Sequence, residues 1–168
     1  RLADLSEATR AALRAFLPPV ASLRNPVDVL GSATPEQYER SLRLLLDDAA
    51  VCAVLPILLP SPLYPVQEMA QAVARAAGDS CKPVICALMG GATIGDAAAV
   101  LRAARLPAYP YPERAAAALG VLARGNAEQQ ARVVGQLRRK LLRGGQERRQ
   151  GLAIVAGQRA IDRPEAVV

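Results

Sequence analysis

The residues best placed to do chemistry lie in the stretch Asn25-Pro26-Val27-Asp28-Val29-Leu30-Gly31. Asn25 offers an amide and Asp28 a carboxylate, within a short apolar run that a glycine ends. A helix is predicted just after this run. Polar residues at a strand end that faces a helix start are where open α/β sheets usually bind ligands. We therefore expect the ligand-binding site here; the alternative is an ordinary strand-to-helix turn.

The helix after this stretch has clear signals at its start. Thr34 can cap it, Pro35 suits its first position and Gln37 completes a capping box. Four residues then share one face at helical spacing: Tyr38, Leu42, Leu45 and Leu46. The pattern predicts a helix over 34–48, and we expect the acidic pair Asp47-Asp48 at its end to be a solvated turn.

Two further loops follow predicted strands. The apolar run 51–59 is typical of a strand that is buried on both faces within a parallel sheet. This strand should end or bulge at Pro56, and a rigid loop at 60–65 follows it. The next strand is predicted at 82–88. In its exit loop, the backbone amides of Gly90 and Gly91 can approach a phosphate or carboxylate, unless this is only a small-residue turn. The loop matches neither G-x-G-x-x-G nor a Walker loop, which excludes dinucleotide and P-loop sites.

Strand, loop and helix alternate at intervals of roughly thirty residues, which favours a doubly wound α/β unit with right-handed crossovers. The remaining elements are helices at 6–17, 66–77, 94–105 and 113–124 and a short last strand at 106–109. On this interpretation the carboxyl edge of the sheet carries three loops, at 25–28, 60–63 and 89–93.

The composition limits the chemistry of the chain. Because the sequence contains no histidine, it excludes acid–base chemistry by histidine, Ser-His-Asp triads, Cys-His dyads and most zinc sites within this chain. Asp28 and Asp96 are isolated acids, and Ser61 has no histidine partner. We therefore expect neither a catalytic residue nor a metal site.

Cysteine use and hydropathy bear on the compartment. Three cysteines without a C-x-x-C pair indicate a reduced compartment with buried, inert thiols, at Cys52, Cys81 and Cys86. No apolar run approaches the ~18 uncharged residues of a membrane span, and the N-terminus has neither Met nor a signal-peptide pattern. We expect a cytoplasmic chain that is a piece of something longer and has no membrane partner.

The net charge of +6 is placed unevenly. Residues 1–123 contain 11 basic and 11 acidic side chains, whereas 124–168 contain 10 basic and 4 acidic ones, so no nucleic-acid-binding surface is expected on the folded body. We divide the chain into a domain at 1–124 and a basic helical linker toward a neighbouring domain at 125–168, with a helix at 127–143. Its cluster Arg138-Arg139-Lys140 can touch phosphate or form a solvated face.

The motifs of the chain, taken in order, resemble those of a known family. They are Asn-Pro-Val-Asp with Thr-Pro-Glu-Gln-Tyr after it, then Ala-Val-Leu-Pro-Ile, then Lys-Pro-Val-Ile with Met-Gly-Gly. Over residues 5–124 the chain looks like one domain of the ADP-forming acyl-CoA synthetases, and it is similar, more distantly, to the carboxyl-terminal domain of the succinyl-CoA synthetase β subunit. The resemblance implies a flavodoxin-like fold whose first strand lies upstream of Arg1 and is missing here.

The resemblance also implies an activity. These enzymes convert acyl-CoA, ADP and phosphate reversibly into acid, CoA and ATP, and a phosphohistidine on another domain carries the phosphoryl group to an ATP-grasp domain. CoA, and ATP or ADP with Mg²⁺, would be bound mainly by other domains. The implied partners are therefore CoA-binding and ATP-grasp domains and a small carboxylic acid, and this fragment alone is expected to be inactive.

The family's substrate contacts map onto particular positions. Asn25 matches an Asn that contacts the carboxylate substrate in the succinyl enzymes. A Gly-rich substrate loop aligns with residues 61–63, where its glycines are gone, which suits an acid smaller or more apolar than succinate. An Asn amide and helix-start amides can orient a carboxylate without removing a proton. The candidate substrate-binding residues are Asn25, Asp28, Ser61, Pro62, Leu63, Gly90 and Gly91.

The main hypothesis is that the chain is a fragment of an ADP-forming acyl-CoA synthetase. Two alternative functions of other classes remain. A non-enzymatic flavodoxin-like interaction or regulatory module, such as a receiver domain, would need an acidic cluster and a phosphoacceptor Asp at strand ends, and only Asp28 is near such a position. A nucleic-acid-binding module would use residues 124–168 and bind with steep salt dependence.

Overall fold

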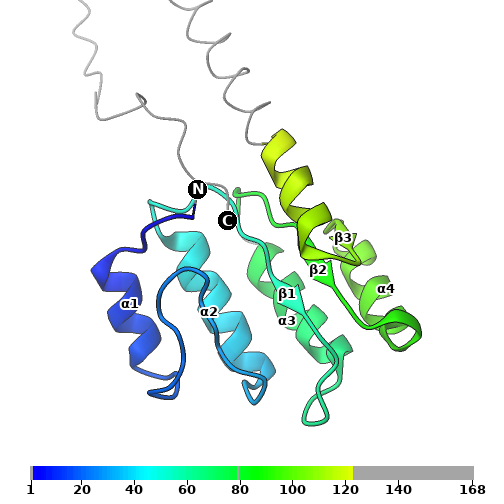
Figure 1. The fold of residues 1–168 in the computed structure, drawn as a ribbon, viewed down its shortest axis with the longest axis horizontal. Helices are drawn as coiled ribbons and strands as arrows, with labels where there is room; N and C mark the ends of the chain where they lie inside the picture. The colour runs from blue at the N-terminus through cyan, green and yellow to red at the C-terminus, as the bar shows by residue number, and fades with distance from the viewer. Residues whose placement is uncertain (1, 79, 123–168) are drawn as a thin grey trace, which may run out of the picture. The chain divides into compact units, whose positions relative to one another are not determined.

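The computed structural model of the chain describes residues 2–78 and 80–122. Its elements alternate in the order α1 (Glu7–Arg14), α2 (Pro35–Asp47), β1 (Ile57–Leu58), α3 (Val66–Gly78), β2 (Cys86–Leu88), the 3-10 helix η1 (Gly91–Ile94), α4 (Gly95–Ala103) and β3 (Ala108–Tyr109) (Figure 1). A further helix occupies residues 112–122. The predicted α/β class is confirmed. The predicted linker 125–168, with its helix 127–143 and its basic cluster, lies outside the described residues.

The three strands form one parallel sheet in the order β1-β2-β3. Ile57 pairs with Ala87, and an isolated parallel bridge between Val54 and Val84 extends the pairing toward the start of both strands. The carbonyl of Pro56 accepts a hydrogen bond from the Ala87 N–H at 2.8 Å. Because Pro56 has no N–H to donate in return, the ladder is interrupted there, and β1 is shorter than its apolar run.

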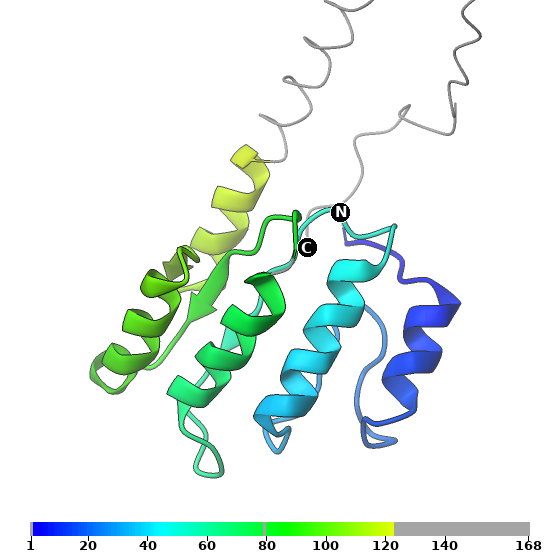
Figure 2. The same cartoon turned by 180° about the vertical axis from the view of Figure 1, so that it is seen from behind.

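Apolar side chains cover both faces of this sheet. On one face, Val54 and Cys86 belong to a core cluster with residues of four helices: Leu13, Leu42, Val73 and Leu101. These helices, α1 to α4, lie side by side in chain order (Figures 1 and 2). On the opposite face, Ile85 and Ala87 pack with Ala115 and Leu119 of the helix 112–122. Alternate strand residues thus bury both faces, as parallel sheets require.

The predicted capping box at the start of α2 is confirmed. Thr34 Oγ1 accepts a hydrogen bond from the Gln37 N–H at 3.2 Å, and Gln37 Oε1 accepts one from the Thr34 N–H at 3.0 Å. Pro35 occupies the first turn, where its missing N–H costs nothing. Gln37 Nε2 also donates to the carbonyl of Phe16 at 3.3 Å, so the cap holds the segment after α1 against α2.

The stretch 25–31 is a loop. The prediction that a strand ends in this stretch, just before the turn into α2, is therefore wrong. An isolated antiparallel bridge joins Asp28 to Ser22, with backbone hydrogen bonds of 3.0 Å in both directions. Because a strand needs successive residues paired with one neighbour, a single bridge closes a loop and makes no ladder. Leu30, with a φ of 73°, then turns the chain toward α2.

Asp48 is a buried anchor and not the solvated turn that the sequence predicted. The residue is 5% exposed, and its carboxylate accepts hydrogen bonds from the N–H groups of Ser6 at 2.8 Å and Ala50 at 2.9 Å. Burial by itself would raise the pKa of Asp48, but hydrogen bonds from Thr9, Ala50 and Ser6 outweigh it and lower the pKa to about 2. The local pattern missed this role because Ser6 lies 42 residues away.

Two expectations about the compartment can be compared with the structure. Cys86 is buried in β2, whereas Cys52 and Cys81 are exposed, so the expectation of three buried thiols is wrong for these two. Cys52 follows the turn after α2 and Cys81 precedes β2, and neither packs into a core cluster. Within residues 2–78 and 80–122, no helix is long and apolar enough to cross a membrane.

We predict that Asp48→Asn lowers the free energy of unfolding by about 2 kcal/mol at about pH 7, because a buried charged acceptor is lost. The folded-state pKa of Asp48 lies below its ordinary value of 3.8, so its contribution is complete above that value and disappears as the pH falls toward 2. Urea unfolding of wild type and variant should therefore give a stability difference that shrinks over this acidic range.

Asp47→Asn is the matched control for this prediction. Asp47 is the exposed neighbour at the end of α2, and its replacement should change the unfolding free energy by less than about 0.5 kcal/mol. A difference between wild type and Asp48→Asn that stays constant with pH would contradict the role assigned to the Asp48 carboxylate.

Candidate functional site

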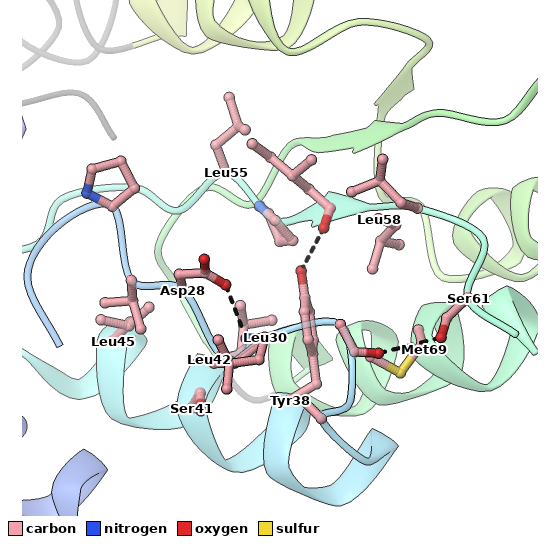
Figure 3. A pocket seen from close by; sticks show the side chains of 18 of the residues that line it. Asp28, Leu30, Tyr38, Ser41, Leu42, Leu45, Leu55, Leu58, Ser61 and Met69 are labelled. Carbon is pink, nitrogen blue, oxygen red and sulfur yellow. Dashed lines mark hydrogen bonds between the residues drawn. The ribbon is translucent and has the colours of Figure 1, made fainter. Parts of the chain in front are cut away.

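A groove of about 450 Å³ lies between the loop 25–31, α2 and β1 (Figure 3). Its lining is mostly apolar and includes Leu30, Leu42, Leu45, Leu55, Leu58 and Met69. Three of the predicted substrate-binding residues also line it: Asn25, Asp28 and Ser61. The other four lie outside the lining: Pro62, Leu63 and Gly90 in neighbouring loops, and Gly91 at the start of η1.

Tyr38 brings a polar group into this groove from α2. Its hydroxyl donates a hydrogen bond to the carbonyl of Ile57 at 3.0 Å (Figure 3). Burial raises the pKa of the Tyr38 phenol above its usual range, so the group stays a neutral donor. The sequence pattern predicts Tyr38 only as part of the apolar face of a helix, and the hydroxyl at this one position of that face was the signal for its role in the groove.

Asn25 and Asp28 both have structural partners within the domain. Asn25 Nδ2 donates to the carbonyl of Ala3 at 3.1 Å and so ties the loop 25–31 to the segment before α1. Asp28 Oδ1 accepts from the Leu30 N–H at 2.9 Å, which shapes the turn at the end of the loop. Both side chains therefore shape the loop in which the sequence predicted the ligand site.

Ser61 joins two of the predicted loops. Its Oγ donates to the carbonyl of Gly31 at 3.2 Å and accepts from the Leu63 N–H at 3.2 Å. The hydroxyl thus connects the end of the loop 25–31 with the segment after β1 and shapes the turn 61–63. Pro62 and Leu63 at this turn are exposed, Leu63 by 60%.

Gly90 brings the loop after β2 against the same segment. It has a φ of 135°, and a Cβ built on it would lie 2.6 Å from Cγ of Pro60 and 2.9 Å from Cγ2 of Ile94. Only glycine fits both this backbone conformation and this contact. Gly91 has a φ of 60° and nothing within 4 Å of an added Cβ, and it begins η1 at an exposed position.

The structure thus assembles one end of the predicted site more tightly than the other. Ser61 reaches Gly31, and Gly90 packs on Pro60, so the loops that follow the predicted strands meet there. Asn25 lies at the opposite end of the loop 25–31, where its side chain is hydrogen-bonded to the carbonyl of Ala3.

This arrangement can bind and orient a ligand. In the part of the chain that the structure describes, no group of three or more His, Cys, Asp or Glu side chains could hold a metal ion. Burial raises the pKa of the Cys86 thiol to about 12, so this thiol stays protonated and is a poor nucleophile. What the loops offer is backbone amides, the Ser61 hydroxyl and the side-chain amide of Asn25.

The comparisons with known proteins identify the domain. Residues 1–138 match the family model of the Ligase-CoA domain. The chain belongs to this family. It is 35% identical over 123 residues to the ADP-forming acetate–CoA ligase I of Archaeoglobus fulgidus, and 37% identical over 141 residues to the α subunit of the ADP-forming acetate–CoA ligase II of Pyrococcus furiosus. These matches confirm the resemblance to the Ligase-CoA domain of ADP-forming acetyl-CoA synthetases.

This Ligase-CoA domain is a small part of its relatives. The matches cover 73% and 80% of this chain but only 17% and 29% of those two ligases. A crystal structure from Pyrococcus horikoshii OT3 aligns with a TM-score of 0.65 at 35% identity, over 68% of this chain and 27% of that one. The dinucleotide-forming acetyl-coenzyme A synthetase 1 of Ca. Korarchaeum cryptofilum, solved with phosphate and ADP, aligns with a TM-score of 0.62 at 31% identity, over 68% and 25%.

We predict that Gly90→Ala destabilises the domain by about 2 kcal/mol, because it forces a side chain into a backbone region that only glycine adopts readily and against Pro60. Chemical denaturation would measure this loss. Gly31→Ala is the matched control, since nothing lies within 4 Å of an added Cβ at Gly31. Equal stability of Gly90→Ala and Gly31→Ala would show that the two loops do not pack as described.

Proposed function

We propose that this Ligase-CoA domain binds and orients the carboxylic acid, or its acyl phosphate, in an ADP-forming acyl-CoA synthetase. The family match over residues 1–138 carries the proposal. The reaction is reversible: acyl-CoA, ADP and phosphate give acid, CoA and ATP. A phosphohistidine on another domain carries the phosphoryl group, which is consistent with a chain that contains no histidine.

The partners in this proposal are a CoA-binding domain and an ATP-grasp domain of the same enzyme. They would bind CoA and the Mg²⁺ complexes of ATP or ADP, and the present chain would hold neither as a resident cofactor. The domain itself would be a flavodoxin-like, doubly wound unit, which helices on both faces of its parallel sheet support. In such sheets ligands bind beyond the carboxyl ends of the strands.

The contacts at that edge suggest how the acid would be held. Backbone amides at Gly90 and Gly91 and the turn that Ser61 closes would offer donors to a carboxylate, and Asn25 would add a side-chain amide. Such groups position the acid and stabilise charge without removing a proton. The loop of Ser61, Pro62 and Leu63 has a proline and an apolar side chain where relatives that use succinate have glycines, which favours a smaller or more apolar acid.

We predict that Asn25→Ala, made in the synthetase that contains this domain, raises the KM for the acid about 10-fold, the effect of losing one hydrogen bond to a charged group. Steady-state kinetics with acetate and propionate would measure it. Arg24→Ala, at the exposed neighbouring position, is the control. If the kinetics are unchanged for every acid but the melting temperature is lower, Asn25 has only a structural role, the hydrogen bond to the carbonyl of Ala3.

We also predict that Leu63→Gly raises kcat/KM for succinate relative to acetate, because removing the exposed side chain opens the loop to a longer acid. The hydrogen bond from the residue-63 N–H to Ser61 Oγ uses the backbone and survives the change. Leu59→Ala, another exposed apolar position after β1, is the matched control. An unaltered ratio for Leu63→Gly would place this loop outside the acid site.

A further inference from the structure

Two exposed thiols lie at the edge of the sheet opposite the loops of the predicted acid site. Cys52 lies in the segment that enters β1, and Cys81 lies in the segment that enters β2. Because β1 and β2 are parallel, both segments reach the sheet at its amino edge. The third cysteine, Cys86, is buried within β2. Cys52 and Cys81 therefore take no part in the contacts of the carboxyl edge.

The pairing of the strands sets which residues lie beside each other at the amino edge. The Val54 N–H donates a hydrogen bond to the carbonyl of Pro83 at 3.0 Å, and an isolated parallel bridge joins Val54 to Val84. Two residues earlier on each segment, the same register brings Cys52 level with the residue that follows Cys81. The two cysteines are thus one step out of register on neighbouring segments.

A single carbonyl oxygen holds these two segments together. The backbone oxygen of Asp48 accepts a hydrogen bond from the Val51 N–H at 3.0 Å and another from the Lys82 ammonium at 2.6 Å. Val51 immediately precedes Cys52, and Lys82 immediately follows Cys81. The two cysteines are therefore direct chain neighbours of two residues that bind the same atom.

This register brings the cysteines within the span of a disulfide. Neighbouring strands lie about 4.8 Å apart and rise about 3.3 Å per residue, so residues one step out of register have Cα atoms roughly 6 Å apart. Disulfides join Cα atoms about 4.4–6.8 Å apart. Val51 and Val54 enter the same core cluster although they are three residues apart, so the regular alternation of side chains is broken here. Alternation therefore does not force Cys52 and Cys81 onto opposite faces.

We propose that Cys52 and Cys81 are a redox-sensitive pair, which glutathione disulfide oxidises to a disulfide that links the entrances of β1 and β2. The thiolate of one cysteine attacks a sulfur of glutathione disulfide, and one glutathione thiolate leaves. The other cysteine thiolate then attacks the protein-bound sulfur of this mixed disulfide, and the second glutathione leaves. Two protein thiols and one glutathione disulfide thus give one protein disulfide and two glutathione thiols.

The disulfide stabilises the domain and leaves the predicted acid site open. It closes a loop from residue 52 to residue 81, which contains β1 and α3. Cross-linking a loop of this length lowers the conformational entropy of the unfolded chain. Because the link lies at the amino edge, it leaves the loops at the carboxyl edge in place. The inference does not depend on the proposed function.

The test is incubation of the 168-residue chain with glutathione and glutathione disulfide, followed by alkylation of the remaining thiols and peptide mass spectrometry. We expect a pair of peptides cross-linked through Cys52 and Cys81. Cys86 should be alkylated only after unfolding, because it is buried. Thermal unfolding of the oxidised chain should give a melting temperature about 10 °C higher than that of the reduced chain.

Cys52→Ser and Cys86→Ala form the matched pair of variants. With serine at position 52, Cys81 has no protein thiol to meet, so its oxidation should stop at the mixed disulfide with glutathione and the rise in melting temperature should vanish. Cys86→Ala keeps both exposed thiols. It should lower the starting melting temperature, because it leaves a cavity in the core, but retain the full rise on oxidation.

Three results would overturn the inference. Mixed disulfides with glutathione at both Cys52 and Cys81, without a cross-link, would show that the two thiols do not meet. A cross-link between two chains, seen as a dimer on a non-reducing gel, would assign the thiols to an interface between copies. A cross-linked chain that melts no higher than the reduced chain would show that closing the disulfide strains the fold.

Discussion

The Asp48 carboxylate ties together segments on which the rest of the domain is built. It accepts hydrogen bonds from Ser6 at the start of α1 and from Ala50 in the turn that leads toward β1, while the carbonyl of the same residue accepts one from the Lys82 ammonium at 2.6 Å. One residue therefore fixes α1, the end of α2 and the approaches to two neighbouring strands. A surface pair such as Glu39 with Arg75, whose guanidinium side chain is 50% exposed, contributes less because water screens it.

Once the approaches to the strands are fixed, parallel pairing decides which loops meet. β1 and β2 run in the same direction, so the segments after Leu58 and Leu88 leave the sheet at the same edge. Gly90 lets them come into contact, and Ser61 reaches across to Gly31. No single loop has the residues for a site. The predicted site therefore depends on the sheet edge, where the segments after β1 and β2 and the end of the loop 25–31 meet.

Local signals were enough to predict much of this fold. The capping box at Thr34 and the interruption at Pro56 act within a few residues, and the apolar runs reveal the buried strands without reference to distant partners. What the sequence could not reveal depends on distant partners. Asp48 is anchored by a residue 42 positions away, and Asn25 bonds to a carbonyl 22 positions away. For the site, loop positions were predictable, but the contact between Gly90 and Pro60 requires the backbone conformation of both loops.

The loops and the groove beside them differ in their chemistry. The loops offer backbone amides and a hydroxyl, which suit a carboxylate, whereas most of the side chains that line the groove are apolar and none of them is Lys or Arg. The two are physically linked, because Gly31 ends the loop on one side of the groove and Ser61 follows β1 on the other, and a hydrogen bond of 3.2 Å joins them. This hydrogen bond therefore fixes the position of the turn 61–63 relative to the end of the loop 25–31, and with it the geometry of two of the loops in which substrate-binding residues are predicted.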